Sequence, residues 1–449
     1  MCGLRGQSPS CPQNYKSAYC LPEYYNDVKD DYMDLILKPT KLYGSVTVPP
    51  SKSAAHRAII SAALAEGTSR IAHVDLSSDI RATIGACRAL GVQIQVDGDT
   101  LTIDGGRPKL TCEPIDCVES GSTLRFFIPI ACVLDGEKTF TGRGRLPQRP
   151  VDAYLNIFDM QGLPYTCPPG ASLPLTVTGA LHPGEFSVDG RISSQFVTGL
   201  LFALPLLEGD SRVIVTGGFE SRGYVDLTAD MLRRFGIRIT ADGDTFVIPG
   251  NQKYQPRDIT VEGDYSQAAF FLVGGALSGG IRVEGLDARS LQPDRAIVDI
   301  LKRMGADIAE ENGALVSRPA QLHGEVIDVS QCPDLVPPLA VAAAFAEGQT
   351  HITGAARLRI KESDRLHALA QNLSALGVRT EELPDGLIIR GGQPAGGVVD
   401  SFGDHRIAMA FSIAAAGASG SVKIHGAECV DKSYPAFYRD YVALGGKII

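Results

Sequence analysis

The chain has 449 residues, of which 44% are hydrophobic and 21% charged, and its formal net charge is −9. This length exceeds what one ordinary hydrophobic core organises, so two or more domains are expected. The acidic balance argues against nucleic acid or an anionic membrane as a partner, because both need a basic protein surface. An anionic ligand would therefore need a local cluster of Arg and Lys.

The longest apolar stretches, residues 268–277 and 407–416, are near ten residues long. Both fall far below the roughly 20 residues that span a bilayer, so they predict buried core helices. The ten Cys are scattered, without a C-x-x-C pair or a Cys/His cluster at zinc spacing. Neither a metal site, a cofactor nor a disulfide framework is indicated. Cysteines after residue 80 are interpreted as small buried hydrophobes in a reducing compartment, the cytoplasm.

Residues 1–32 differ from the rest of the chain. They hold Cys2, Cys11 and Cys20 and several Tyr and Asp, without apolar periodicity. The hydrophobic segment of a signal peptide is also missing. We expect a flexible N-terminal extension and assign it no function.

One unit recurs about every 70 residues, and such a repeat dictates the fold. Each unit opens with a small polar cluster, continues through an Ala- and Leu-rich helical stretch, turns at a Gly and ends in a β-branched run. A second helix follows in every unit. The six openings are residues 51–53, 120–122, 193–195, 263–265, 332–334 and 403–405.

Glycines punctuate each unit twice. The first helices are expected to turn near Gly67, Gly136, Gly209, Gly279, Gly348 and Gly420. The second helices are expected to end at Gly91, Gly162, Gly236, Gly305, Gly377 and Gly445, because Gly adopts the left-handed conformation that closes a helix. Strand patterns then resume, as in residues 92–96 and 237–239. The unit is roughly β-α-β-α-β-β, the fold class is α/β, and six units group most simply as two domains of three.

The openings lie at predicted helix starts, where free N–H groups and the helix dipole favour anions. In the simpler interpretation, these polar residues are only N-caps. However, reactive residue types repeat at equivalent positions. Six helix starts can thus converge on one anionic ligand.

Cations occur at the first of these helix starts and in a later loop. Lys52, Ser53 and Arg57 put two positive charges and a hydroxyl at the first helix start. Arg145 and Arg149 lie in a Gly- and Pro-bearing loop, where guanidinium groups can bind carboxylate or phosphate in bidentate fashion. Taken singly, each Arg is more often a surface residue.

Neutral hydrogen-bonding residues gather at another helix start. Ser193, Ser194 and Gln195 follow one another, and Ser221 and Tyr224 lie in a second Gly-bearing loop. They predict a phosphate cradle. Helix capping alone would explain the same residues.

Two charged clusters complete the candidates. Residues 361–365 read Lys-Glu-Ser-Asp-Arg after the strand-like residues 357–360, and residues 404–406 read Asp-His-Arg before an apolar helix. On a solvent-facing helix such charges would be ordinary salt bridges. A charged triplet next to a buried helix is less easily explained as surface.

Together these motifs resemble those of the EPSP synthase family, the 3-phosphoshikimate 1-carboxyvinyltransferases, over about nine tenths of the chain from Leu35 onward. Each motif is weak alone, but six in order on a matching repeat are specific. They are P-x-K-S-x-x-x-R at residues 49–57, where Pro50 and Ser51 both stand between Pro49 and Lys52, S-G-S-T-x-R at 120–125, R-P at 149–150, S-S-Q at 193–195, K-E-S-D-R at 361–365 and D-H-R at 404–406.

The resemblance implies two domains of the inside-out α/β barrel type with inward-facing helices, in an enzyme that transfers the enolpyruvyl group of phosphoenolpyruvate to shikimate 3-phosphate. It implies that shikimate 3-phosphate is bound by Lys52, Ser53, Arg57, Ser193, Ser194, Gln195, Ser221, Tyr224, Asp334 and Lys361. It implies that phosphoenolpyruvate is bound by Lys52, Gly121, Arg149, Gln195, Arg365, Arg406 and Lys432. Two positions depart from the pattern: Glu119 and Arg357 stand where many or some relatives carry Asn, which puts local contacts in doubt.

The chemistry requires a base near the substrate 5-hydroxyl and an acid near C3 of phosphoenolpyruvate. Asp334 is the candidate for the hydroxyl, and Glu362 with Lys52 for the proton at C3. Because the clustered cations belong to both halves, catalysis should require domain closure. We expect one domain at residues 33–50 plus 263–449, on the phosphoenolpyruvate side, and one at 51–262, on the shikimate 3-phosphate side, with hinges near Pro50 and residues 262–263.

Two alternatives stay open. The sibling transferase that acts on UDP-N-acetylglucosamine typically has Asn after the first Lys and a Cys in the mobile loop, whereas this chain has Ser53 and a loop over residues 139–151 without Cys. A non-catalytic repeat scaffold is the other, and the retained charged positions argue against it. The expected protein is a monomer without cofactor.

Overall fold

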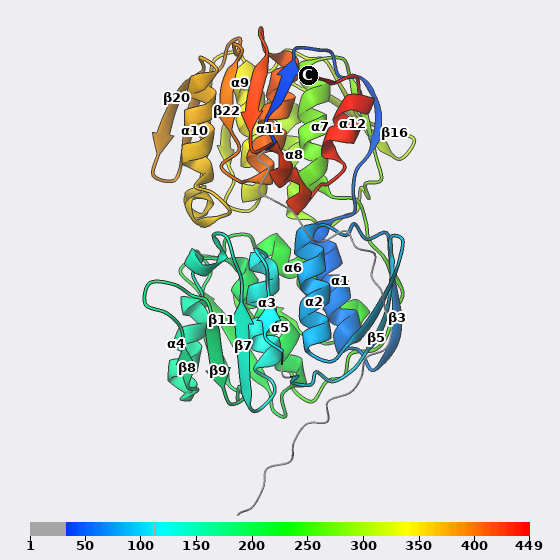
Figure 1. Ribbon diagram of the computed structural model, residues 1–449, viewed down its shortest axis with the longest axis vertical. Coiled ribbons are helices and arrows are strands. Elements are labelled where there is room, and N and C mark those ends of the chain that lie inside the picture. The colour runs from blue at the N-terminus through cyan, green and yellow to red at the C-terminus, as the bar shows by residue number, and fades with distance from the viewer. Residues whose placement is uncertain (1–32, 112) are drawn as a thin grey trace, which may run out of the picture. The chain divides into compact units, whose positions relative to one another are not determined.

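Six four-stranded sheets and the helices between them form the computed structural model, which describes residues 33–111 and 113–449. The expected extension at residues 1–32, with Cys2, Cys11 and Cys20, lies outside the described residues. Residues 33–449 form one compact unit. Figure 1 shows the blue N-terminal strand lying among the orange and red elements of the chain's end.

The strands of the first half of the chain are β1 (Leu35–Lys38), β2 (Gly44–Thr47), β3 (Gly67–Ala72), β4 (Gln93–Asp97), β5 (Thr100–Gly105), β6 (Ile115–Asp116), β7 (Glu137–Thr141), β8 (Tyr165–Thr166), β9 (Leu175–Thr178), β10 (Glu185–Asp189), β11 (Ser211–Thr216), β12 (Thr240–Asp242), β13 (Thr245–Ile248) and β14 (Ile259–Thr260). Those of the second half are β15 (Ile281–Glu284), β16 (Asp307–Glu311), β17 (Ala314–Arg318), β18 (Val326–Asp328), β19 (Gln349–Thr353), β20 (Arg379–Leu383), β21 (Gly386–Arg390), β22 (Gly397–Asp400), β23 (Val422–His425) and β24 (Lys447–Ile448).

The α-helices are α1 (Lys52–Leu64), α2 (Ser78–Ala89), α3 (Gly121–Ala131), α4 (Asp152–Gln161), α5 (Ser194–Ala203), α6 (Arg222–Arg234), α7 (Tyr265–Leu277), α8 (Ala296–Arg303), α9 (Val336–Phe345), α10 (Arg365–Ala375), α11 (His405–Gly417) and α12 (Phe437–Ala443). The short 3-10 helices are η1 (Leu146–Gln148), η2 (Leu204–Leu206), η3 (Pro293–Arg295), η4 (Pro333–Leu335), η5 (Ala356–Ile360) and η6 (Ala427–Lys432).

Every sheet repeats one pattern of pairing. In the sheet β18-β19-β21-β20, the first pair is parallel and the other two are antiparallel. The sheet β14-β3-β5-β4 takes its parallel strand from far along the chain, and the sheet β22-β23-β1-β24 takes β1 from the beginning. The strand β2 likewise completes the sheet β16-β17-β15-β2. The predicted β-α-β-α-β-β unit is confirmed, and three of the six units are completed by strands distant in sequence.

The buried hydrophobic side chains form two separate clusters. One lies within residues 54–261, and the other combines residues 37–48 with residues 265–444. We call residues 52–261 the central lobe, and residues 35–48 with 264–448 the terminal lobe. The connections run side by side, since Pro50 forms a β-bridge with Gly263 and the Ser51 N–H donates to the Glu262 carbonyl at 2.7 Å. The domain boundaries within this unit stay a prediction.

Apolar helices occupy the interior of each lobe. Helices α7, α9 and α11 contact one another and are buried on nearly all sides, because each is covered both by helices and by sheet. Helices without a polar face are expected at such positions. The two long apolar stretches lie within α7 and α11 and are core helices, as predicted. No helix of the described residues is long and apolar enough to cross a membrane.

The prediction that the second helix of each unit ends at a left-handed Gly is confirmed. Gly91, Gly162, Gly236, Gly305 and Gly377 all have positive φ, between 68° and 96°, and so does Gly445 at 92°. A Cβ atom would strain this conformation. Six described cysteines are free: Cys87, Cys117, Cys132 and Cys332 are buried, and Cys167 and Cys429 are half-buried. The interpretation as small buried hydrophobes thus holds for four of them.

Two local expectations were wrong. Residues 237–239 are not a strand, because the Arg238 N–H donates to the Gln252 side chain at 2.7 Å and pairing begins only at β12. Residues 357–360 belong to the 3-10 helix η5. Arg357 and Leu358 are both buried, and two adjacent inward side chains are incompatible with the alternation of a strand.

Candidate active site

The six predicted openings meet in one cleft of about 990 Å³, counting its open mouth. Every opening contributes to its lining: Lys52 and Ser53, Gly121 and Ser122, Ser193 to Gln195, Asp264, Asp334, and His405. Several of these helices are also capped by their opening residues, since Ser51, Ser120, Ser193, Asp264 and Asp404 accept N–H hydrogen bonds in the first turn. The opening residues therefore cap their helices and also line one common cleft, so the two interpretations are compatible.

All but one of the predicted site residues line this cleft. They are Lys52, Ser53, Arg57, Gly121, Arg149, Ser193, Ser194, Gln195, Ser221, Tyr224, Asp334, Lys361, Glu362, Arg365 and Arg406. The exception, Lys432, lines an adjoining cavity whose wall also includes Arg149 and Glu362. The sequence motifs thus identify one continuous region, although their roles toward ligands stay predictions.

Arg365 organises the carboxylates of the terminal lobe. The residue is 1% exposed, and its guanidinium group contacts Asp404 at 2.7 Å, Asp334 at 2.9 Å and Glu362 at 2.8 Å. Asp364 caps α10 just before it and accepts the His367 N–H. A planar guanidinium group that meets three carboxylates fixes their geometry.

The cations around these carboxylates decide their charge. Burial opposes ionisation of Asp334, but Arg406, Lys361 and Arg365 outweigh it and hold the pKa of Asp334 well below its usual range. Burial likewise opposes ionisation of Glu362, and Arg365, Arg149 and Lys432 lower its pKa. Both carboxyl groups are therefore ionised in the ligand-free cleft. Burial lowers the pKa of Lys361 to about 8.

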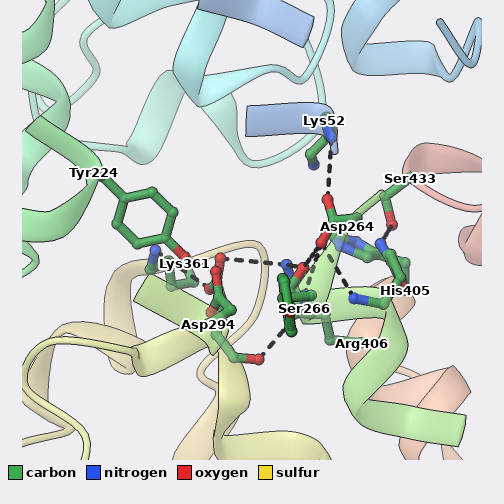
Figure 2. A network of polar contacts seen from close by, with 12 residues as sticks. Lys52, Tyr224, Asp264, Ser266, Asp294, Lys361, His405, Arg406 and Ser433 are labelled. Atoms are coloured by element: carbon green, nitrogen blue, oxygen red, sulfur yellow. Dashed lines mark hydrogen bonds and ion pairs between the residues drawn. The ribbon is translucent and has the colours of Figure 1, made fainter. Parts of the chain in front are cut away.

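Lys52 is held at the first helix start from two sides. Its Nζ contacts Asp79 at 2.8 Å. Its backbone N–H donates to Asp264 at 3.0 Å, and Figure 2 shows these two residues side by side. Asp79 lies in the first turn of α2 and is buried, so Lys52 is anchored in the central lobe while its backbone contacts the terminal lobe.

Glycine at position 121 makes room for Arg149. A Cβ atom there would lie 2.5 Å from the Arg149 guanidinium carbon, which is closer than atoms can pack. Next to it, Gln195 accepts from Arg125 at 2.8 Å and donates to Ser122 at 2.9 Å. The side chains of Arg149 and Gln195 are therefore positioned by the protein alone.

The other end of the cleft carries hydroxyl groups. Ser221 is buried and has φ of 54°, a rare conformation for a residue other than Gly. The Arg57 guanidinium group donates to Thr228, to the Ser53 carbonyl at 2.6 Å and to the Tyr224 carbonyl at 2.9 Å. Burial lowers the pKa of Arg57 to about 10, which leaves it positively charged at neutral pH.

Polar contacts join the two lobes across the cleft. Arg149 contacts Glu362 at 3.3 Å, and the Tyr224 hydroxyl donates to Asp294 at 2.6 Å. The two positions that depart from the family pattern join lobes as well: Glu119 contacts Lys432 at 3.3 Å, and Arg357 pairs with Glu220. Among the described residues, no group of three His, Cys, Asp or Glu side chains could hold a metal ion.

A family model described as EPSP synthase (3-phosphoshikimate 1-carboxyvinyltransferase) matches residues 36–441. The chain belongs to the EPSP synthase family. The resemblance inferred from the six motifs is thereby confirmed. A 3-phosphoshikimate 1-carboxyvinyltransferase of Clostridium novyi (strain NT) is 50% identical over 423 residues, which cover 91% of this chain and 97% of that protein.

Solved structures of EPSP synthases agree with the fold. EPSP synthase from Acinetobacter baumannii superposes with a TM-score of 0.79 at 32% identity, covering 93% of this chain and 100% of that one. The enolpyruvyl transferase NikO from Streptomyces tendae superposes with a TM-score of 0.75 at 20% identity, covering 93% of this chain and 98% of that one. At this identity the similarity supports a shared fold and no more. The predicted inside-out α/β architecture is confirmed by these neighbours.

Several cleft residues of this EPSP synthase family member were absent from the predicted site. They are Asp79, Ser122, Arg125, Asp264, Ser266, Arg357 and His405. Four of them had a signal: Ser122, Arg125 and His405 stand inside quoted motifs, and Asp264 stands in a predicted opening. Asp79 had none, because an acidic residue in the first turn of a helix is ordinary.

Proposed function

We propose that this protein transfers the enolpyruvyl group of phosphoenolpyruvate to the 5-hydroxyl of shikimate 3-phosphate, releasing phosphate. One observation carries the proposal: cations from both lobes converge on one cleft inside an acidic protein. Those that line it are Lys52, Arg57, Arg125, Arg149, Arg357, Lys361, Arg365 and Arg406. Two substrates with multiple negative charges would repel each other unless such a cluster offset their charge. The reaction belongs to the shikimate pathway of aromatic amino acid biosynthesis.

The hydroxyl-bearing end of the cleft suits shikimate 3-phosphate. Ser193, Ser194 and Ser221 present hydroxyl groups near a helix N-terminus, as a phosphate requires. Ser53, Arg57, Gln195 and Tyr224 complete the contacts of the central lobe with this substrate. Lys52 binds it from the same lobe, and Asp334 and Lys361 bind it from the terminal lobe.

Phosphoenolpyruvate would occupy the end of the cleft at Gly121. Arg149, Arg365 and Arg406 are buried guanidinium groups that can form paired hydrogen bonds with carboxylate or phosphate. Lys52, Gln195 and Lys432 complete this binding site. Binding there would place the carboxylate and phosphate of the substrate among the cations that face Glu362.

The reaction proceeds by addition and elimination. Asp334, ionised beside the 5-hydroxyl, accepts its proton while the oxygen attacks C2, and C3 takes a proton from Glu362 or Lys52. The tetrahedral adduct then loses a proton from C3 and expels phosphate. Because Glu362 is ionised in the ligand-free cleft, it must gain a proton when phosphoenolpyruvate binds. The negative charge of that substrate offsets Arg365 and Arg149 and raises the pKa of Glu362.

Closure of two domains would assemble this site. We place the boundaries at residues 50–51 and 262–263, where the two connections lie side by side, so that residues 51–262 form the domain of shikimate 3-phosphate and the remainder from residue 33 that of phosphoenolpyruvate. The separate hydrophobic clusters support this division. The protein acts as a monomer in the cytoplasm.

Phosphate release tests the proposal directly. Purified protein should release inorganic phosphate when both substrates are present, and neither substrate alone should suffice. UDP-N-acetylglucosamine in place of shikimate 3-phosphate separates the sibling activity. No release with either acceptor at high protein concentration would favour a non-catalytic scaffold.

A further inference from the structure

Asp294 is a buried carboxyl group that forms no ion pair with any described residue. It lies in the 3-10 helix η3 of the terminal lobe and is 3% exposed. One oxygen, Oδ2, accepts a hydrogen bond from the Tyr224 hydroxyl of the central lobe at 2.6 Å. The other, Oδ1, is buried without a hydrogen-bond partner. Figure 2 shows Tyr224 pointing toward Asp294 across the cleft.

The neighbours of Asp294 favour its neutral form. Asp334 of η4 and Asp264 at the start of α7 face it with negative charge, and the Cys332 thiol lies near. Arg406 of α11 is the nearby cation, but its guanidinium group contacts Asp334 and the Ser266 hydroxyl instead. A carboxylate with one hydrogen bond, no paired cation and two acidic neighbours is costly to bury. Burial, then Asp334, raises the pKa of Asp294 to about 7.

We propose that Asp294 is a positioning residue: as a neutral carboxylic acid it holds Tyr224 in the cleft, and it takes its proton from solvent when the lobes close around shikimate 3-phosphate. The inference rests on the proposed function, because that function identifies shikimate 3-phosphate as the ligand around which the lobes close. Tyr224 and Asp294 belong to different lobes, so separation of the lobes would expose the carboxyl group to water. There it would ionise like an ordinary Asp.

The sign of the pH dependence follows from these two states. The closed state has the higher pKa, about 7, and the open state the ordinary 3.8. Below pH 3.8, Asp294 is protonated in both states and adds nothing to the free energy of closure. Between pH 3.8 and about 7, closure requires proton uptake, so its free energy becomes less favourable as pH rises. Above about pH 7 this contribution stays constant. Because the bound substrate adds negative charge, the upper limit lies at or above pH 7.

Calorimetric titration of the full-length protein with shikimate 3-phosphate tests this linkage. The ratio of the dissociation constant of the wild type to that of Asp294→Asn should rise roughly tenfold or more between pH 5.5 and pH 7, and then level off. Asn keeps the oxygen that accepts from Tyr224 but does not ionise, so it imitates the neutral acid. Taking the ratio removes the titration of the substrate phosphate, which is common to both proteins. The wild type should also take up more protons per substrate bound than Asp294→Asn when buffers of different ionisation enthalpy are compared.

Asp299→Asn is the matched control, since Asp299 lies five residues further on, exposed on α8. This control should keep the wild-type ratio and proton uptake at every pH. If Asp294→Asn does not fold, infrared difference spectra of the wild type decide, because substrate binding below pH 7 should create the band of a protonated carboxyl group.

The outcomes separate this inference from the proposed function. A pH-independent ratio with equal proton uptake, or no new carboxyl band, overturns the role of Asp294 even if the enzyme is active. Failure of the wild type to bind shikimate 3-phosphate or release phosphate overturns the proposed function itself.

Discussion

The two lobes repeat one unit three times each, yet they bring different chemistry to the cleft. Among the described lining residues, each lobe supplies four cations. The central lobe adds seven neutral hydrogen-bonding side chains, namely Ser53, Ser122, Ser193, Ser194, Gln195, Ser221 and Tyr224, and one carboxylate, Asp79. The terminal lobe adds three carboxylates, Asp264, Asp334 and Glu362, and one hydroxyl, that of Ser266.

This difference suggests a division of labour. A wall of hydroxyl groups and cations with a single carboxylate of its own is suited to binding a phosphorylated substrate in its ground state and its transition state alike. A wall of carboxylates fixed by guanidinium groups is suited to moving protons. Substitutions in the terminal lobe should therefore act mainly on kcat, and those in the central lobe mainly on KM.

Arg365→Met should have the largest effect, because it removes the partner of three carboxylates at once. Breaking buried ion pairs in this way costs about 3–5 kcal/mol of unfolding free energy. We expect a marked fall in the denaturation midpoint together with loss of phosphate release. Arg359→Met is the control. Its side chain is 29% exposed and pairs with Asp364 and Glu382 outside the cleft, so that loss should cost about 1 kcal/mol or less. Equal stability of the two variants would contradict the organising role of Arg365.

Glu362→Gln should rank second, with kcat reduced by about 10²–10⁴-fold and a native denaturation curve. The amide keeps the shape of the side chain but cannot donate a proton to C3. The KM for shikimate 3-phosphate should change little, since we propose that other residues bind that substrate. Glu382→Gln changes an exposed carboxylate of the same lobe that lies on β20, away from the cleft, and should retain full turnover. Unchanged kcat in Glu362→Gln would leave Lys52 as the candidate acid.

Gly121→Ala tests the binding role of the central lobe. The added methyl group would meet the Arg149 guanidinium carbon at 2.5 Å and force it away. We expect the KM for phosphoenolpyruvate to rise about tenfold or more, since a charged hydrogen bond contributes about 1.5–3 kcal/mol. Gly85→Ala on α2 of the same lobe adds its methyl group to open space and should leave KM unchanged. A normal KM in Gly121→Ala would mean that Arg149 does not bind phosphoenolpyruvate as proposed.

The sequence predicts those features of the site that recur with the unit. Because the same helix start appears six times, position within the repeat predicts that Lys52, Asp334 and Arg406 face one region. Features that depend on contact between distant elements were missed. Asp79 and Asp294 look like ordinary acidic residues of a first helical turn, and only tertiary packing makes them buried partners of Lys52 and Tyr224.

Local backbone geometry was predicted less well where a side chain lines the cleft. Residues 357–360 alternate in character like a strand, but Arg357 turns toward the cleft while the neighbouring Leu358 enters the core. A 3-10 turn satisfies both demands and a strand does not. The residues that line the cleft thus override the local pattern at these positions.

Ser194→Ala should have the smallest effect. It tests whether a single hydroxyl of the central lobe acts on KM rather than on kcat. Ser194 is 6% exposed at the start of α5, while the neighbouring Ser193 supplies the N-cap, so removing the Ser194 hydroxyl should leave the helix intact. Loss of one hydrogen bond to the substrate phosphate costs about 1–1.5 kcal/mol, which corresponds to a rise of about five- to tenfold in the KM for shikimate 3-phosphate. Ser187→Ala, on an exposed position of β10, controls for the substitution itself. A fall in kcat with unchanged KM would show that this hydroxyl acts in the transition state, and the proposed division between a binding lobe and a reactive lobe would then be wrong.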